Sequence, residues 1–182
     1  NGTITGSGST LKFYGSSLTN NGVISSPNLS LDSTSTLSGA GSYTGGNIIV
    51  TANGNISLLN NVTFSISSKL TINNGGTFSA NTFILTFTSG TIEVLSGGTV
   101  ANSGTVRTQG TVTINSRTGS AFRANLNVAS GTTIATELSS PYNGRLFGNV
   151  TVDNGATLSS FNSSSYTLYI YGNLTNNGTI TG

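Results

Sequence analysis

Short stretches of alternating apolar and polar residues recur along the whole chain. In one of them Val62, Phe64 and Ile66 alternate with Thr63 and Ser65. The same pattern is found at Phe83, Leu85 and Phe87, at Val112 and Ile114, at Val150 and Val152, and at Leu168 and Ile170. A period of two places the apolar side chains on one face of a β-strand. Gly and Asn separate the stretches, as in turns, and helix-forming residues never cluster. The pattern predicts an all-β protein.

A unit of strand, glycine turn and strand is repeated along the chain. The copies cover residues 70–78, 92–100, 126–134, 150–158 and 174–180. Their turn glycines are Gly75, Gly97, Gly131, Gly155 and Gly178, whose successive spacings are 22, 34, 24 and 23. Such a period fits one coil of a solenoid with about three short strands. The spacing of 34 predicts an insertion or a skipped turn between residues 105 and 124.

The repeat therefore predicts a parallel β-helix (β-solenoid) with about eight coils of 22–24 residues, forming one domain over residues 1–182. The alternative architecture is an antiparallel β-sandwich, which would also have short strands and turns. A sandwich does not predict a unit restated at this period.

Two of these segments carry a resemblance to known proteins. Residues 70–78 read Leu-Thr-Ile-Asn-Asn-Gly-Gly-Thr-Phe, and residues 173–182 read Asn-Leu-Thr-Asn-Asn-Gly-Thr-Ile-Thr-Gly. They resemble the repeats of bacterial surface adhesins, which include autotransporter passengers and repetitive secreted proteins of the Bacteroidetes type. The resemblance implies a right-handed parallel β-helix, secretion, and an extracellular or cell-surface role. It transfers no functional residue.

The two ends of the chain have the same sequence, Asn-Gly-Thr-Ile-Thr-Gly, at residues 1–6 and 177–182. The offset of 176 equals eight coils of 22, so we expect the last coil to end where the first begins. Solenoid ends expose strand edges and core unless they are capped, and no cap is evident. We therefore expect head-to-tail self-assembly or continuation as a tandem array. The apolar residues expected at the assembly ends are Ile4, Phe13, Tyr14, Tyr169, Tyr171, Leu174 and Ile180. The chain starts at Asn1 rather than Met, which predicts a mature form or a segment of a longer protein.

The composition of the chain limits the kinds of binding site that it can form. More than half of the 182 residues are Ser, Thr, Asn or Gly, and only ten are charged. Arg107, Arg117 and Arg123 come closest to a basic patch, and we interpret them as solvated side chains on one side of the rod rather than as a nucleic-acid site. The chain has no His and no Cys, so we expect no metal site and no cofactor. The chain contains no run of 18 apolar residues, so we expect no membrane insertion.

Catalysis would depend on four carboxylates, Asp32, Glu93, Glu137 and Asp153. Glu93 and Glu137 are separated by 44 in residue number, which is two coils, and stacked carboxylates could act on a polysaccharide as in an inverting glycosidase. We favour two unrelated surface acids and expect no enzyme, because no aromatic platform accompanies Glu93.

Two binding functions remain as alternatives to a structural module of a filament, stalk or adhesin. Thr-x-Thr tripeptides at residues 3–5, 86–88, 111–113 and 179–181 resemble an ice-binding array, but they do not recur once per coil. Tyr142, Tyr166, Tyr169 and Tyr171 could stack on surface glycans. Asn-x-Ser/Thr sequons mark candidate glycan acceptors at Asn28, Asn55, Asn61, Asn149, Asn162 and Asn173.

Overall fold

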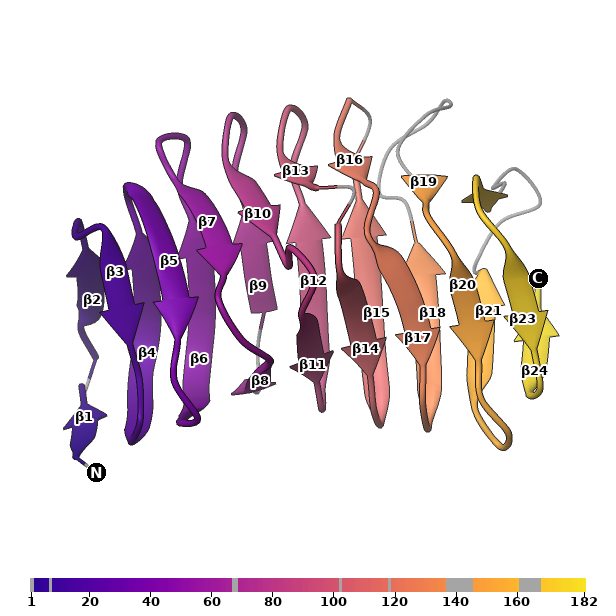
Figure 1. Ribbon diagram of the computed structural model, residues 1–182, viewed down its shortest axis with the longest axis horizontal. Coiled ribbons are helices and arrows are strands. Elements are labelled where there is room, and N and C mark those ends of the chain that lie inside the picture. The colour runs from indigo at the N-terminus through magenta and orange to yellow at the C-terminus, as the bar shows by residue number, and fades with distance from the viewer. Residues whose placement is uncertain are drawn as a thin grey trace.

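The computed structural model describes residues 2–6, 8–66, 69–101, 103–117, 119–136, 146–160 and 168–182. Within these ranges the chain forms 24 β-strands and no helix. Every strand pair is parallel, and the strands stack along one axis with the two termini at opposite ends (Figure 1). The predicted β-solenoid is therefore confirmed, and the antiparallel sandwich is wrong.

Each coil has three faces, numbered here in the order in which the chain visits them. Face 1 consists of β1 (Thr3–Thr5), the start of β4 (Val23–Leu31), the start of β6 (Ser42–Val50), β8 (Val62–Ile66), β11 (Ile84–Phe87), β14 (Thr105–Thr108), β17 (Asn125–Val128), β20 (Val150–Val152) and β23 (Leu174–Asn176).

Face 2 consists of β2 (Thr10–Phe13), the ends of β4 and β6, β9 (Lys69–Ile72), β12 (Gly90–Val94), β15 (Thr111–Ser116), β18 (Thr132–Thr136), β21 (Thr157–Ser160) and β24 (Thr179–Thr181). Face 3 consists of β3 (Ser17–Thr19), β5 (Thr34–Ser38), β7 (Asn55–Leu58), β10 (Thr77–Ser79), β13 (Thr99–Val100), β16 (Ala121–Phe122), β19 (Leu146–Phe147) and β22 (Tyr169–Ile170). From β1 to β20 the chain makes about seven turns, close to the eight coils predicted.

Coil length varies along the axis. On face 1, Val23 pairs with Ser42 at a sequence offset of 19, whereas Leu126 pairs with Val150 at an offset of 24. Thr105 pairs with Asn125 at an offset of only 20, so the insertion predicted between residues 105 and 124 is wrong. The longest offsets come afterwards, where Leu126 pairs with Val150 at 24 and Thr132 pairs with Thr157 at 25.

The spacing of 34 has another cause, because the repeat unit occupies two different corners. Gly75, Gly97 and Gly119 turn the chain from face 2 to face 3 in three successive coils. The Gly75 N–H donates a hydrogen bond to the Gly97 carbonyl at 3.1 Å, and the Gly97 N–H donates one to the Gly119 carbonyl at 3.0 Å. Gly131 and Gly155 instead lie between faces 1 and 2. Positive φ is found at all of these glycines, Gly75, Gly97, Gly119, Gly131 and Gly155. A Cβ on Gly97 would also clash with the Asn74 side chain. Both corners need the same glycine turn, so their sequences look alike.

Apolar side chains fill the interior in columns that follow the strand register. On face 1, Ile24 pairs with Tyr43, Tyr43 with Phe64 and Phe64 with Phe87. The three aromatic rings meet edge to face, with centroids 5.2 and 5.5 Å apart. Further along the axis, the buried Thr108 and Thr133 hydroxyls bond each other at 2.6 Å. The period-two alternation thus identified the core correctly, at Phe64, Leu85, Val112, Val150 and other positions that are 0–2% exposed.

Candidate functional site

The first coil presents an uncovered interior at the N-terminal end of the solenoid. Ile4 is 49% exposed although it continues the column of Ile24, which is 4% exposed. Tyr14 follows β2 directly and is also exposed. Phe13 continues the column of the buried Leu31 and is half-buried against the core. The strand edge of this coil has no neighbour on its outer side among the described strands.

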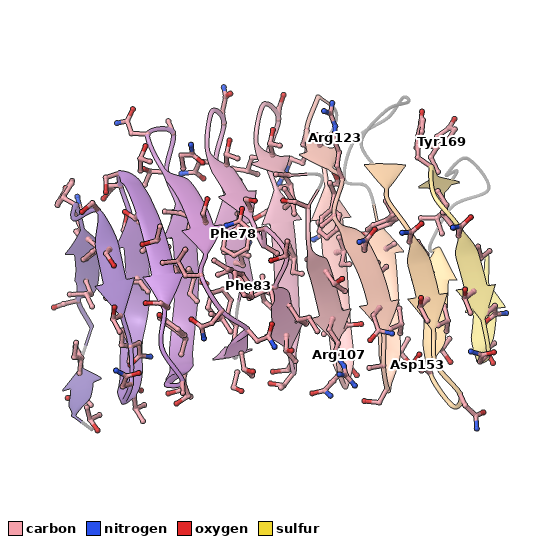
Figure 2. The ribbon with its side chains drawn as sticks, in the orientation of Figure 1. Phe78, Phe83, Arg107, Arg123, Asp153 and Tyr169 are labelled. Atoms are coloured by element: carbon pink, nitrogen blue, oxygen red, sulfur yellow. The ribbon has the colours of Figure 1, made fainter. Side chains whose placement is uncertain are left out.

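The last coil has the same character. Leu174 is 50% exposed above Val150, and Ile180 is 37% exposed above Leu158, while both of these partners are fully buried. Tyr169 and Tyr171 lie just before them in the chain and are exposed, with Tyr169 at the C-terminal end in Figure 2. Six of the seven residues expected at the ends are thus exposed apolar side chains, and the seventh, Phe13, is partly covered.

Sequence reasoning missed other apolar residues of these coils. Leu11 and Leu18 point inward in the end coils and are only partly covered, as is Ile170, which the alternation had already assigned to the interior. The alternation of Leu11 with Phe13 was the available signal. Leu59 was also missed: it is 52% exposed, but it lies in the turn between β7 and β8, far from either end.

The matched hexapeptide does not mark equivalent positions. Its first copy forms β1 on face 1, whereas its second copy forms β24 on face 2. The prediction that the last coil ends where the first begins is therefore wrong by one face. As with the glycines, the same short sequence occurs on two different faces of the coil.

Glu93 is held in an ion-pair column on face 2. It is 7% exposed, and its carboxylate accepts hydrogen bonds from Lys69 Nζ at 2.8 Å and Arg117 at 3.0 Å. Burial alone would raise the pKa of Glu93, but the bonds from Lys69 and Arg117 outweigh it and hold the pKa below its usual value. A general acid needs a raised pKa, so this carboxylate is poorly suited to that role. Its proposed partner, Glu137, lies outside the described residues.

The three arginines do not gather on one side of the rod, contrary to the expectation. They belong to one coil but leave it on different faces: Arg107 on β14, Arg117 after β15 and Arg123 after β16. Figure 2 shows Arg107 and Arg123 at opposite edges of the molecule. The arrangement offers no dense basic patch.

Asparagines form a ladder at the corner between faces 3 and 1. The Asn149 backbone N–H donates to the Asn125 side-chain oxygen at 2.8 Å, and the Asn173 N–H donates to Asn149 in the same way. Asn-rich turns predict ladders of this kind. Each side chain thereby holds the coil that follows it.

The sequon asparagines differ in their surroundings. Asn55, Asn61, Asn149 and Asn173 are exposed, while Asn28 is half-buried in β4 and accepts a bond from Asn47 at 2.8 Å. Asn61 also accepts from the Ile84 backbone N–H at 2.9 Å. Asn162 lies outside the described residues, as do Tyr142 and Tyr166. Glycan attachment stays a prediction.

Hydroxyl side chains form columns on the outer side of face 2. Thr111, Thr132, Thr157 and Thr179 are successive register partners, one per coil. The neighbouring column contains Thr113, Ile134, Ser159 and Thr181, so that Ile134 interrupts its hydroxyls. The full Thr-x-Thr tripeptide does not recur in every coil, as expected, but a single threonine column does. The tripeptides at residues 3–5 and 86–88 belong to face 1 or its edge instead.

The part of the chain that the structure describes contains no cluster of three or more metal-ligating His, Cys, Asp or Glu side chains. It also contains no helix of the length and hydrophobicity that crossing a membrane requires. No protein-family model matches the chain, and neither a curated protein nor a solved structure is significantly similar to it.

Proposed function

We propose that this chain is a structural module of an extracellular filament, stalk or adhesin, and that it assembles end to end through its open coils. The observation that carries the proposal is the contrast in exposure within single columns, such as Leu174 at 50% and Val150 at 0%. Exposed strand edges with apolar residues are ready templates for a further strand. Head-to-tail contacts that do not close on themselves produce filaments.

The chemistry of the ends supports association. Residues 168–182 carry no charged side chain, and residues 2–19 carry only Lys12. Two such ends meet without like-charge repulsion between side chains and with little charge that must be desolvated. Elsewhere the surface is rich in neutral hydroxyls and amides, which do not titrate in the physiological range. A rod of this kind suits a secreted or cell-surface location, in keeping with the resemblance to surface adhesins.

Sedimentation velocity and electron microscopy of the purified chain test the proposal. We expect polymers that grow with concentration and are abolished by Leu174→Lys. Leu59→Lys is the matched control, because Leu59 is equally exposed but lies at neither end. A chain that stays monomeric at high concentration, or a Leu59→Lys effect as large as that of Leu174→Lys, contradicts end-to-end assembly.

The threonine column of face 2 favours a second candidate function, adsorption to ice. Parallel strands repeat about every 4.8 Å, so the column presents methyl and hydroxyl groups at a regular spacing near that of a crystalline water lattice. Inhibition of ice recrystallisation is the test. Thr157→Tyr should abolish it by breaking the column, while Thr99→Tyr, on face 3, should not. No inhibition by the parent chain eliminates this candidate.

A further inference from the structure

The described strands do not divide evenly into coils of three strands, because face 3 has one strand position fewer than faces 1 and 2. Because β4 and β6 each cover two faces, the 24 strands fill 26 positions, which is two strands more than eight coils of three. The last two positions are β23 on face 1 and β24 on face 2. On face 3 the outermost described strand is β22, one level lower. The C-terminal surface is therefore a step, with its low side on face 3.

We propose that a second copy of this chain docks on this step rotated by one face. Its β1 lies on β22, its β2 lies on β23 and its β3 lies on β24, so that the second copy fills the low side of the step and continues the helical path. This inference rests on the proposed end-to-end assembly and specifies its register.

The inward side chains match strand by strand in this arrangement. One apolar residue points inward from β22, Ile170, and one points inward from β1, Ile4. Both strands of the next pair direct two side chains inward: Leu174 and Asn176 in β23, and Leu11 and Phe13 in β2. In the third pair, Ile180 of β24 meets Leu18 of β3. Inward residues are those whose register partners are buried in the coil beneath or above.

Docking without rotation fits less well. It would place β1, with one inward residue, on β23, with two, and β2, with two, on β24, with one. It would also leave the position above β22 empty, so that β3 of the second copy would lie two levels away. An empty strand position leaves backbone groups unpaired and a cavity in the core, and both are unfavourable.

Cysteine cross-linking distinguishes the two registers, and the natural chain has no cysteine to interfere. Thr175 is the outward residue between Leu174 and Asn176, and Lys12 is the outward residue between Leu11 and Phe13; both are exposed. Rotated docking makes them neighbours across the joint, about 5 Å apart between Cα atoms, which a disulfide can span. Unrotated docking instead brings Thr175 next to Thr3, because the register of face 1 places both in one outward column.

The experiment compares Lys12→Cys/Thr175→Cys with Thr3→Cys/Thr175→Cys under mild oxidation, followed by non-reducing electrophoresis. We expect a ladder of covalent oligomers from the first variant and none from the second. Each single variant is a control, since it can form at most a dimer. Circular dichroism confirms that the variants keep the β-solenoid.

The remaining outcomes separate the two proposals. A ladder only from Thr3→Cys/Thr175→Cys overturns the rotated register and keeps end-to-end assembly. The same holds if neither variant forms a ladder while the chain sediments as a polymer. If neither forms a ladder and the chain sediments as a monomer, both proposals are overturned.

Discussion

The middle coils and the end coils are built from the same kinds of side chain and differ in what covers them. Ile4 and Ile24 are the same residue type in one column, yet one is 49% exposed and the other 4%. Val150 and Leu174 show the same contrast at the other end. Burial in this fold is thus supplied by the neighbouring coil rather than by the strand itself, as expected for a repeat architecture. In the described chain, the end coils therefore expose side chains of the kind that the middle coils bury.

The largest difference in stability between middle and end coils is expected in the aromatic column of Tyr43, Phe64 and Phe87. Phe64 is fully buried between Tyr43 and Phe87, so Phe64→Ala should lower the free energy of unfolding by about 3–5 kcal/mol through a lost transfer term and a cavity. Phe13 is the matched control, because it occupies the same kind of inward position in the first coil. Phe13→Ala should lower it by less than half as much. Equal losses in urea denaturation would contradict the distinction between middle and end.

Tyr43 makes the middle coils sensitive to alkali. Burial raises the pKa of Tyr43 from 10.0 to about 12, and the nearby Asn20 side chain offsets only part of this rise. The pKa of Tyr43 is higher in the folded state than in the unfolded state. The contribution of the protonated hydroxyl to the free energy of unfolding is therefore complete below pH 10 and is lost as the pH rises towards 12. The expected loss is on the order of 2–3 kcal/mol by pH 12.

Tyr43→Phe should remove this slope. Unfolding measured between pH 9 and 12 provides the comparison. An unchanged slope in Tyr43→Phe would show that Tyr43 is not its source.

The buried hydroxyl pair tests how strictly the middle coils demand hydrogen-bond partners. Thr108→Val leaves the Thr133 hydroxyl without its partner at 2.6 Å and should cost about 1–3 kcal/mol. The double variant Thr108→Val/Thr133→Val should regain most of that loss, since both polar groups are gone. Additive losses in this double-mutant cycle would mean that the two hydroxyls do not depend on each other.

The smallest expected loss of stability comes from Glu93, which lies on the outer side of face 2. Because its folded pKa is lowered, its contribution is present above about pH 4.5 and is lost as pH falls through the folded value. Glu93→Gln should cost about 1–2 kcal/mol at pH 7, since Lys69 and Arg117 are themselves partly solvated. The cost should shrink at pH 3, and a constant cost across this range would contradict the ion-pair account.

The sequence predicted the strands and the core well because alternation is a local signal. Phe64, Leu85 and Val152 could be assigned to the interior from their immediate neighbours alone. The phase of the repeat could not be predicted in this way. The Thr-Ile-Thr of the repeated hexapeptide lies on face 1 at residues 3–5 and on face 2 at residues 179–181, and only the register of the stacked coils distinguishes the two faces.

Long-range register also explains the site features that the sequence missed. The ion pairs of Glu93 join residues of successive coils, and the threonine column of face 2 joins dissimilar tripeptides. The arginines looked clustered because they are close in the chain, but the winding of a single coil turns them to different faces.

Mixing two variants with opposite ends blocked is the most direct test of the central claim that the open ends are mutual binding surfaces. Ile4→Lys blocks the first coil, and Leu174→Lys blocks the last. In sedimentation velocity each variant alone should be monomeric, and an equimolar mixture should form heterodimers and nothing larger, through the one pair of intact ends. A mixture that remains monomeric, or variants that polymerise alone, would contradict the account.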